Sequence, residues 1–361
     1  MKIVAPHSAE ARCPRCGTRP PPFRPIPDRP GWVTCSAVFE SHKLFFGDDV
    51  CAFECPLSWQ RLPFVRVGAS GVPADGQSTW NVLAHQRLWS LGGVPDAPVS
   101  VPPWGLSANV EATRDYQSLL NGIRLPATLP SSCDSSDGYW TYFPSIHGNQ
   151  AAHGCVVAVK DFAGEIVRGF TAEDASRCQL LDSDGLVVFV DPTKTPDTWL
   201  SPMKGFFEDL RARRGVASGP PLDLPVALVV PKIDQLLHFA ATVADASRIE
   251  GVIHAMRGAG PMNEATTLEA IGRRQRLTVE LLRDALPLED TVARIESVVG
   301  RNRVTVFPVA AFGWQNTPLE DLGAIGDLHL AHRWLIENSF GVLDPLLWMI
   351  HQHGVYRLPA R

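Results

Sequence analysis

Five short apolar runs, most of them rich in valine, recur between amphipathic segments of this sequence. The runs lie at residues 62–67, 155–160, 185–190, 225–230 and 304–309. Near-continuous apolar runs of this length are typical of strands that are covered on both faces. The amphipathic segments predict helices at residues 78–90, 173–181, 202–214, 234–257, 264–286 and 327–352. Strands that alternate with helices predict an α/β fold with a doubly wound, mostly parallel sheet.

The distribution of cysteine, proline and glycine predicts how the chain is divided. Five of the eight cysteines precede residue 56. We therefore expect a small module at residues 1–60 and an α/β domain at residues 61–361. Within the second part, residues 91–150 are rich in Pro, Ser and Gly, and "YWTYF" is their only clear strand candidate. A long irregular segment of this kind is typically functional or mobile, so we expect a switch or insert region there.

Composition and charge exclude several classes of protein. The formal net charge of −5 gives no general attraction to nucleic acid or to an anionic membrane. No apolar run approaches the roughly 20 residues that span a bilayer, and the start of the sequence lacks the apolar core of a signal peptide. These features predict a cytoplasmic protein with no direct contact to nucleic acid or membrane.

The clustered cysteines have the spacing of a metal site. Cys13 and Cys16 form a C-x2-C pair followed by glycine, as in zinc knuckles, where turn amides point at two thiolates on one tetrahedral ion. Cys51 and Cys55 would complete four sulfur ligands, although Cys35 or His42 could replace one of them. The alternative is that these residues are reduced thiols in a turn. Our prediction is a zinc-knuckle module.

The stretch "GVPADGQST" follows the first apolar run and precedes a helix. Strand, glycine loop and helix is the context in which backbone N–H groups bind phosphates. Gly71, Gly76, Ser78 and Thr79 match the offsets of such a loop, but Gln77 replaces the lysine that would contact the outer phosphates. A glycine-rich turn before a helix is the simpler alternative.

The other strands are each followed by polar residues in a defined order. The segments are "DFAGE" from Asp161, "DPTKTPD" from Asp191, "PKID" from Pro231 and "AAFG" from Ala310. In open parallel sheets, ligands bind beyond the carboxyl ends of the strands. We therefore expect these segments to share one binding edge.

With these segments in this order, the chain resembles the Ras-like and translation-factor class of P-loop GTPases over roughly residues 60–355. It is most similar to the double-GTPase group of bacterial conflict systems, which often carry an N-terminal cysteine knuckle. The resemblance implies a P-loop GTPase-like fold that binds GTP or GDP with Mg²⁺. "DFAGE" and "PKID" in register are its most specific elements.

The resemblance also implies roles on the phosphate side of the site. Asp161 and Ser78 would hold Mg²⁺, Asp161 through water. Gly164 would give its backbone N–H to the terminal phosphate. Glu165 takes the place where many relatives have a glutamine that orients the attacking water. Thr128 is the candidate for the switch threonine that senses the terminal phosphate.

On the base side, the resemblance implies that Asp234 accepts the two N–H donors of the guanine edge. The aliphatic stem of Lys232 would lie along the base, and a backbone amide at Ala310 or Ala311 would meet the guanine oxygen. Asp234 could instead act as a helix N-cap, and both roles could hold at once. Pro231 replaces the asparagine or threonine that would tie this turn to the phosphate loop.

These departures shape the predicted function. Gln77 brings no positive charge to the phosphates. The loop is also longer than usual, which would put the acidic Asp75 near the position of the phosphates. The sequence therefore predicts a guanine-nucleotide-binding switch with a degraded site and slow or absent hydrolysis. It would act through a protein partner, a second GTPase or an effector, in bacterial defence. One alternative is a nucleotide-free pseudo-GTPase scaffold. Another is an active GTPase whose cation comes from a partner or from Arg66, Lys194 or Arg168.

Overall fold

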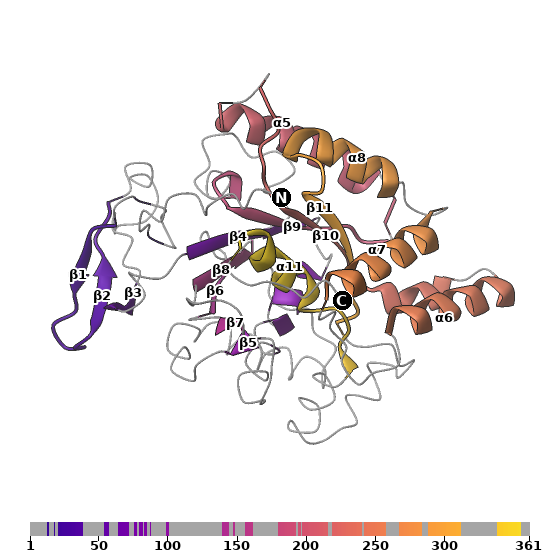
Figure 1. Cartoon of the computed structure of the whole chain (residues 1–361), viewed down its shortest axis with the longest axis horizontal. Coiled ribbons are helices and arrows are strands. Elements are labelled where there is room, and N and C mark those ends of the chain that lie inside the picture. The colour runs from indigo at the N-terminus through magenta and orange to yellow at the C-terminus, as the bar shows by residue number, and fades with distance from the viewer. Residues whose placement is uncertain are drawn as a thin grey trace.

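The structure, a computed structural model, describes part of the chain at the level of individual residues. These are residues 13, 18, 21–38, 54–57, 64–71, 76–77, 79–81, 83–84, 87, 99–100, 139–143, 147–148, 156–161, 180–192, 194–195, 197–215, 219–239, 242–257, 267–283, 288–311 and 338–354. They include a six-stranded sheet, most of the helices that cover it, and a separate three-stranded sheet (Figure 1).

The six-stranded sheet has the strand order β11-β10-β9-β4-β8-β6. Its strands are β4 (Phe64–Ser70), β6 (Tyr139–Phe143), β8 (Val156–Asp161), β9 (Gly185–Phe189), β10 (Val226–Val230) and β11 (Val304–Pro308). All neighbouring pairs are parallel except β6 with β8, which is antiparallel. The five apolar runs therefore form the parallel strands, and "YWTYF" forms the antiparallel edge. The predicted doubly wound, mostly parallel sheet is confirmed.

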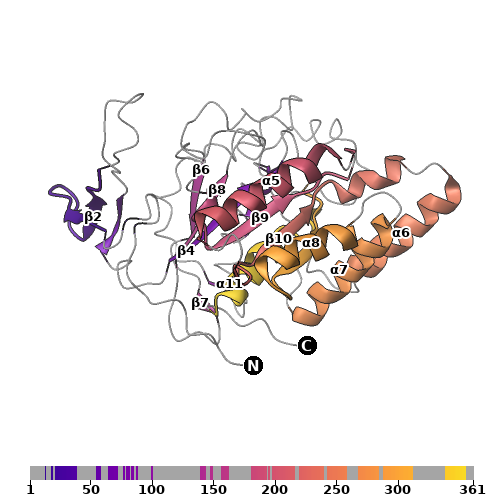
Figure 2. The same cartoon turned by 90° about the horizontal axis from the view of Figure 1, so that it is seen from above.

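Helices cover both faces of this sheet. On one face, the helix that begins at Gln77 packs with α11 (Asp344–Gln352) and with the first part of α7 (Leu268–Leu282), whose last part packs with the opposite face. The opposite face carries α5 (Asp197–Arg213), the 3₁₀ helix η5 (Ile233–Phe239), α6 (Val243–Arg257) and α8 (Leu288–Val299). Figures 1 and 2 show α5 and α8 on the side of the sheet away from α11. Both faces of β9 and β10 are buried, which explains their continuous apolar sequences.

Two predicted helices differ from those observed. The segment 234–257 is not one helix, because Thr242 accepts a hydrogen bond from the Asp245 backbone N–H (3.1 Å) and starts α6 separately from η5. The helix expected over residues 327–352 is described only from residue 338, and α11 begins at Asp344. Gly341 just before it has a φ of +65°, which interrupts a helical path.

A small antiparallel sheet lies to one side of the α/β body, as both views show (Figures 1 and 2). It consists of β1 (Phe23–Pro25), β2 (Trp32–Cys35) and β3 (Glu54–Pro56). Arg29 lies over the Trp32 ring at 3.9 Å and pairs with Glu54 at 2.7 Å, which links the β1–β2 turn to β3.

Two further strands fall in the region expected to be irregular. β5 (Val99–Ser100) and β7 (His147–Gly148) form a two-stranded antiparallel sheet. Among the described helices, none has the length and apolar character needed to cross a bilayer.

Candidate functional site

The strand order reverses at β4, and this reversal marks the candidate site. From β4 the chain leads outward to β6 and back to β8, whereas from β9 it leads the other way to β10 and β11. The helix after β4 and the helix after β9 lie on opposite faces of the sheet. At such a switch point the two connections diverge and open a crevice beyond the carboxyl ends of the strands, where ligands of open α/β sheets bind.

The glycine-rich loop follows β4 at this point. Ser70 ends the strand, Gly71 is buried beside it, and residues 72–75 lie outside the described part. Gly76 has a φ of +83°, a left-handed conformation that glycine adopts without steric cost. Its carbonyl then accepts a hydrogen bond from the Trp80 N–H (2.9 Å), which starts the helix. Thr79 is helical and partly buried, and Ser78 is not among the described residues.

Gln77 occupies the position of the expected lysine, and its side chain has a defined partner. The amide Nε2 donates to the backbone oxygen of Ala69 in β4 at 3.0 Å, and the residue is 8% exposed. The side chain therefore joins the helix start to the end of β4. The Ser70 hydroxyl at the same edge is buried and has no hydrogen-bond partner in the described part of the chain. A buried hydroxyl left unpaired costs about 1–3 kcal/mol, so a ligand or water at this edge would stabilise it.

Asp161, the predicted Mg²⁺ ligand, ends β8 at the same edge. In the parallel register it is the partner of Ala69, one residue before the end of β4. The backbone of Asp161 is thus adjacent to the start of the glycine loop. Gly164, Glu165 and Thr128 lie outside the described residues, so their predicted roles remain predictions.

The segment "PKID" follows β10 and forms a tight turn. Lys232 has a φ of +54°, an uncommon left-handed conformation for a residue with a side chain. Its Nζ pairs with the carboxylate Oδ2 of Asp191 at 2.7 Å. Asp234 is partly buried in the first turn of η5 rather than ahead of it, so it does not stand at the N-cap position.

The end of β11 supplies the last segment of this edge. Ala310 forms an isolated antiparallel bridge with Phe340, in which each N–H donates to the other's carbonyl oxygen (3.1 and 2.9 Å). The Ala310 amide is therefore engaged within the protein. Ala311, the next residue, is partly buried against the core. For Ala311, the amide contact with the guanine oxygen stays a prediction.

Three residues at this edge were not singled out from the sequence. Asp191 is fully buried just after β9, the Ser70 hydroxyl has no hydrogen-bond partner among the described residues, and the Trp80 indole N–H donates to the Val342 oxygen at 2.8 Å. The sequence pattern gave little information about them, because an aspartate that follows an apolar run is usually exposed at the end of a strand. Only the tertiary structure shows that Asp191 is buried.

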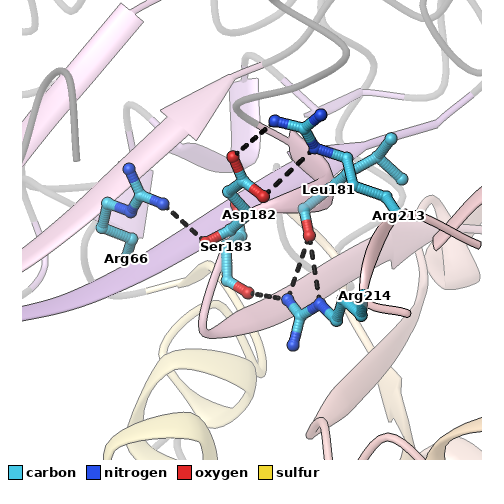
Figure 3. A network of polar contacts seen from close by, with 6 residues as sticks. All are labelled: Arg66, Leu181, Asp182, Ser183, Arg213 and Arg214. Carbon is cyan, nitrogen blue, oxygen red and sulfur yellow. Dashed lines mark hydrogen bonds and ion pairs between the residues drawn. The ribbon is translucent and has the colours of Figure 1, made fainter. Parts of the chain in front are cut away.

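Of the three predicted supplementary cations, Arg66 and Lys194 lie at opposite edges of the sheet, and Arg168 lies outside the described residues. Arg66 lies in the first half of β4. Its Nη2 donates to the Asp182 backbone oxygen at 2.5 Å (Figure 3). Its backbone N–H donates to Asp184 Oδ2 at 2.8 Å. Asp184 immediately precedes β9, so this contact lies at the amino edge of the sheet, and the prediction that Arg66 serves the phosphates is wrong. Lys194 lies in the turn after β9, where its backbone N–H donates to the backbone oxygen of Asp191 at 3.2 Å.

The network at the amino edge joins α5 to the turn before β9 (Figure 3). Arg213 forms two hydrogen bonds with the Asp182 carboxylate (3.2 and 3.0 Å). Arg214 donates to the backbone oxygens of Leu181 and Ser183. Burial lowers the pKa of Arg214 below its usual value, and the Asp182 carboxylate opposes that shift. Because these arginine side chains donate mainly to backbone oxygens, the cluster stabilises the turn before β9.

Three of the N-terminal cysteines are buried, two of them in the three-stranded sheet. Cys13, Cys35 and Cys55 are 0% exposed. Cys55 pairs in register with Val33, so it is diagonal to Cys35 on the neighbouring strand. Burial, followed by the nearby Cys35, raises the pKa of Cys55 to about 12. Among the described residues no cluster of three or more potential metal ligands is found, and Cys16 and Cys51 lie outside them.

Comparison with protein family models and with curated proteins finds no match. Among solved structures, the chain is similar to the FeoB G-domain from Methanococcus jannaschii (14% identity, TM-score 0.27, covering 75% of this chain and 98% of that one). It is also similar to the G domain of the T. maritima FeoB iron transporter (11%, 0.24, 76% and 96%). A variant of SsGBP matches at 13% identity and a TM-score of 0.25 over 72% of this chain, which spans only 53% of that protein. The TM-scores are low in each case, and the class of this protein is therefore defined by its own strand order: a doubly wound α/β protein whose strand order reverses between β4 and β9.

Proposed function

We propose that this chain binds guanine nucleotide at the carboxyl edge of its sheet, as a switch whose phosphate site is degraded. The observation that carries the proposal is the convergence of four segments on that edge. The glycine loop follows β4, Asp161 ends β8, Lys232 and Asp234 follow β10, and Ala311 follows β11. Strands in this order bring phosphate-binding and base-binding segments to one crevice.

On the phosphate side, the backbone of Gly71, Gly76 and Thr79 would surround the phosphates, with the N-terminus of the helix contributing its partial positive charge. Asp161 and Ser78 carry oxygen atoms, the ligands that Mg²⁺ prefers. The buried Ser70 hydroxyl, which has no partner in the part of the chain that the structure describes, supports an additional polar contact here. Gly164, Glu165 and Thr128 would complete this side from residues outside the described part.

Gln77 is the reason to propose slow or absent hydrolysis. The charge that develops during phosphoryl transfer requires a cation, and a neutral amide that is already bonded to Ala69 does not provide one. Bound nucleotide would then act mainly by favouring one conformation, which a protein partner would recognise. A second GTPase or an effector of bacterial defence is the partner that the resemblance suggests.

Nucleotide affinity tests this proposal directly. The wild-type protein should bind fluorescent GDP more tightly than fluorescent ADP, because a carboxylate at Asp234 pairs with two guanine donors that adenine lacks. Asp234→Asn should weaken GDP binding by about 2–5 kcal/mol, the usual effect of losing a buried charged hydrogen-bond partner. Asp245→Asn, an exposed carboxylate in the first turn of α6, is the matched control and should bind like wild type. Equal affinity of the wild type for GDP and ADP would refute the proposal.

The Gln77–Ala69 hydrogen bond also supports a second candidate function, a scaffold that binds no nucleotide. In that case the loop is closed by its own glutamine, and the fold serves assembly with other proteins. Heating protein that was purified without added nucleotide distinguishes the switch from the scaffold. Release of GDP or GTP supports nucleotide binding, and release of neither from folded protein supports the scaffold.

A third candidate, an active GTPase with its cation supplied from elsewhere, rests on Lys194. This lysine follows β9 at the crevice edge, two residues beyond the turn proline. GTP turnover of about 1 s⁻¹ or faster, lost in both Lys194→Met and Asp161→Ala, would favour this candidate over the switch.

The N-terminal sheet is proposed to hold one Zn²⁺ with Cys13 and Cys16 and two of the thiols at Cys35, Cys51 and Cys55. The support is that Cys13, Cys35 and Cys55 are fully buried, and that Cys35 and Cys55 lie on neighbouring strands of a very small sheet. A structural metal stabilises small modules whose hydrophobic core is limited. Elemental analysis should give about one zinc per chain, and Cys13→Ser should lower it while leaving the α/β body folded. Protein purified without chelator that contains no zinc would refute the site.

A further inference from the structure

Asp191 is a fully buried carboxylate at the centre of the candidate edge. It follows β9, whose pairing with β10 continues through the Val190 N–H to the Val229 oxygen (2.8 Å). Burying a carboxylate is costly unless it is paired with a cation or well hydrogen-bonded. The Lys232 ammonium lies 2.7 Å from its Oδ2, and the two side chains are 30% and 0% exposed for lysine and aspartate. The pair thus links the end of β9 to the turn after β10.

The backbone conformation of Lys232 is unfavourable and has to be stabilised by contacts with neighbouring residues. Its φ of +54° is left-handed, a conformation that residues with a Cβ adopt only where the surroundings impose it. The residue before it, Pro231, has neither a backbone N–H nor a side-chain amide, so it cannot tie the turn to the neighbouring loop. The ion pair with Asp191 is one contact that ties this turn to the end of β9.

The position of Asp234 depends on this turn. The Lys232 oxygen accepts from the Gln235 N–H at 2.9 Å, which starts η5, and the Ile233 N–H donates to the Val309 oxygen at 3.3 Å. Asp234 lies between these two anchored residues. Any rotation of Lys232 out of its left-handed conformation would therefore move the Asp234 carboxylate.

We infer that Asp191 is a positioning residue which, through Lys232, fixes the turn carrying Asp234 and thereby sets how sharply the site recognises the base. The part of this inference that concerns base recognition depends on the proposed guanine-nucleotide function. The anchoring of the turn does not, because it concerns the ligand-free protein. Asp191 itself needs no contact with the nucleotide.

The test compares Asp191→Asn with a matched control on the same sheet. Asp191→Asn keeps the shape and one acceptor oxygen but removes the charge. Asp184→Asn makes the same change at the opposite, amino edge, where the carboxylate accepts from the Arg66 N–H. If Asp191→Asn does not fold, the double variant Asp191→Asn/Lys232→Gln removes both charges and leaves a neutral hydrogen-bonding pair in their place.

Two measurements are made on full-length protein. Hydrogen exchange of the η5 amides in the ligand-free protein should be about tenfold faster in Asp191→Asn than in wild type, with α5 unchanged. The ratio of GDP to IDP affinity reports base recognition, because IDP lacks the 2-amino group that a carboxylate at Asp234 would accept from. This ratio should fall by about tenfold in Asp191→Asn and stay at the wild-type value in Asp184→Asn.

The outcomes distinguish the anchoring of the turn by Asp191 from the recognition of the base. Unchanged η5 exchange in Asp191→Asn overturns the inference, even if nucleotide binds normally. Faster η5 exchange with an unchanged GDP to IDP ratio overturns the role in base recognition. Faster η5 exchange in a protein whose wild type binds neither nucleotide supports the anchor and overturns the proposed function.

Discussion

The side-chain amide of Gln77 donates a hydrogen bond to the backbone oxygen of Ala69, and both residues are buried. Ala69 is the penultimate residue of β4, and Gln77 is the first residue of the helix after the glycine loop. The contact therefore closes the loop at its base and holds the helix start against the strand. A glutamine suits this contact because it donates without bringing a charge into a buried position.

This arrangement predicts the behaviour of Gln77→Lys. A lysine here has to leave the buried contact with Ala69 or bury its charge, and Asp75 in the lengthened loop would compete for it. We expect GTP turnover indistinguishable from background in the wild type and little rescue in Gln77→Lys, measured as phosphate release under single-turnover conditions. Gln77→Met, which removes the donor without adding charge, serves as control. A gain in turnover of about 100-fold in Gln77→Lys alone would show that the loop already points this position at the phosphates.

The α/β sheet was predictable because its evidence is local. Strands such as β9 and β10 are buried on both faces, so their sequences are apolar at every position. Helix α8 had a comparable local signal, since Leu288, Ile295 and Val299 recur at helical spacing, but the prediction did not include it.

The contacts that shape the candidate edge were not predictable, because they join residues distant in sequence. The Lys232–Asp191 pair, the Ala310–Phe340 bridge and the Trp80–Val342 hydrogen bond each connect separate segments. No periodicity or spacing carries information about such pairs. Helix α11 shows the consequence: its apolar pattern extends N-terminally, whereas residues 339–343 leave the helical path to contact β11 and Trp80.

Trp80 should contribute to stability through its indole N–H as well as its ring. Trp80→Phe keeps an aromatic ring against Phe189 but leaves the buried Val342 oxygen without this donor. Unfolding in urea should show a loss of about 1–3 kcal/mol from that unpaired oxygen, with a further contribution from the smaller ring. Trp348→Phe is the control, because the described contact of that ring is with Phe307. A Trp80→Phe variant no less stable than Trp348→Phe would contradict the importance of the hydrogen bond.

The buried ion pair between Arg274 of α7 and Asp344 of α11 should be costly to break and easy to replace. The two groups lie 2.6 Å apart and are 5% and 1% exposed, and the guanidinium also lies over the Phe340 ring at 4.4 Å. Arg274→Met should destabilise the protein by about 3–5 kcal/mol, because the buried Asp344 carboxylate loses this cation and the Met256 oxygen loses a donor. The double variant Arg274→Met/Asp344→Leu should recover most of this loss in the same denaturation experiment. Equal stability of the single and double variants would show that the charge pair does not set the cost.

Two glycines with similar positive φ angles should respond very differently to a methyl group. Gly341 has a φ of +65° and Gly354 a φ of +69°, so alanine is strained at either position by about 1–2 kcal/mol. A Cβ at Gly354 would meet nothing within 4 Å, whereas a Cβ at Gly341 would overlap the backbone oxygen of Pro308 at the end of β11. That oxygen belongs to a strand packed on both faces and cannot move without disturbing the neighbouring Ala310–Phe340 bridge. Gly341→Ala should therefore lower the free energy of unfolding clearly more than Gly354→Ala, and it should speed hydrogen exchange at the Ala310 amide. If the two variants unfold at the same denaturant concentration, the segment before α11 has room to shift, and its contact with β11 is not a fixed boundary of the site.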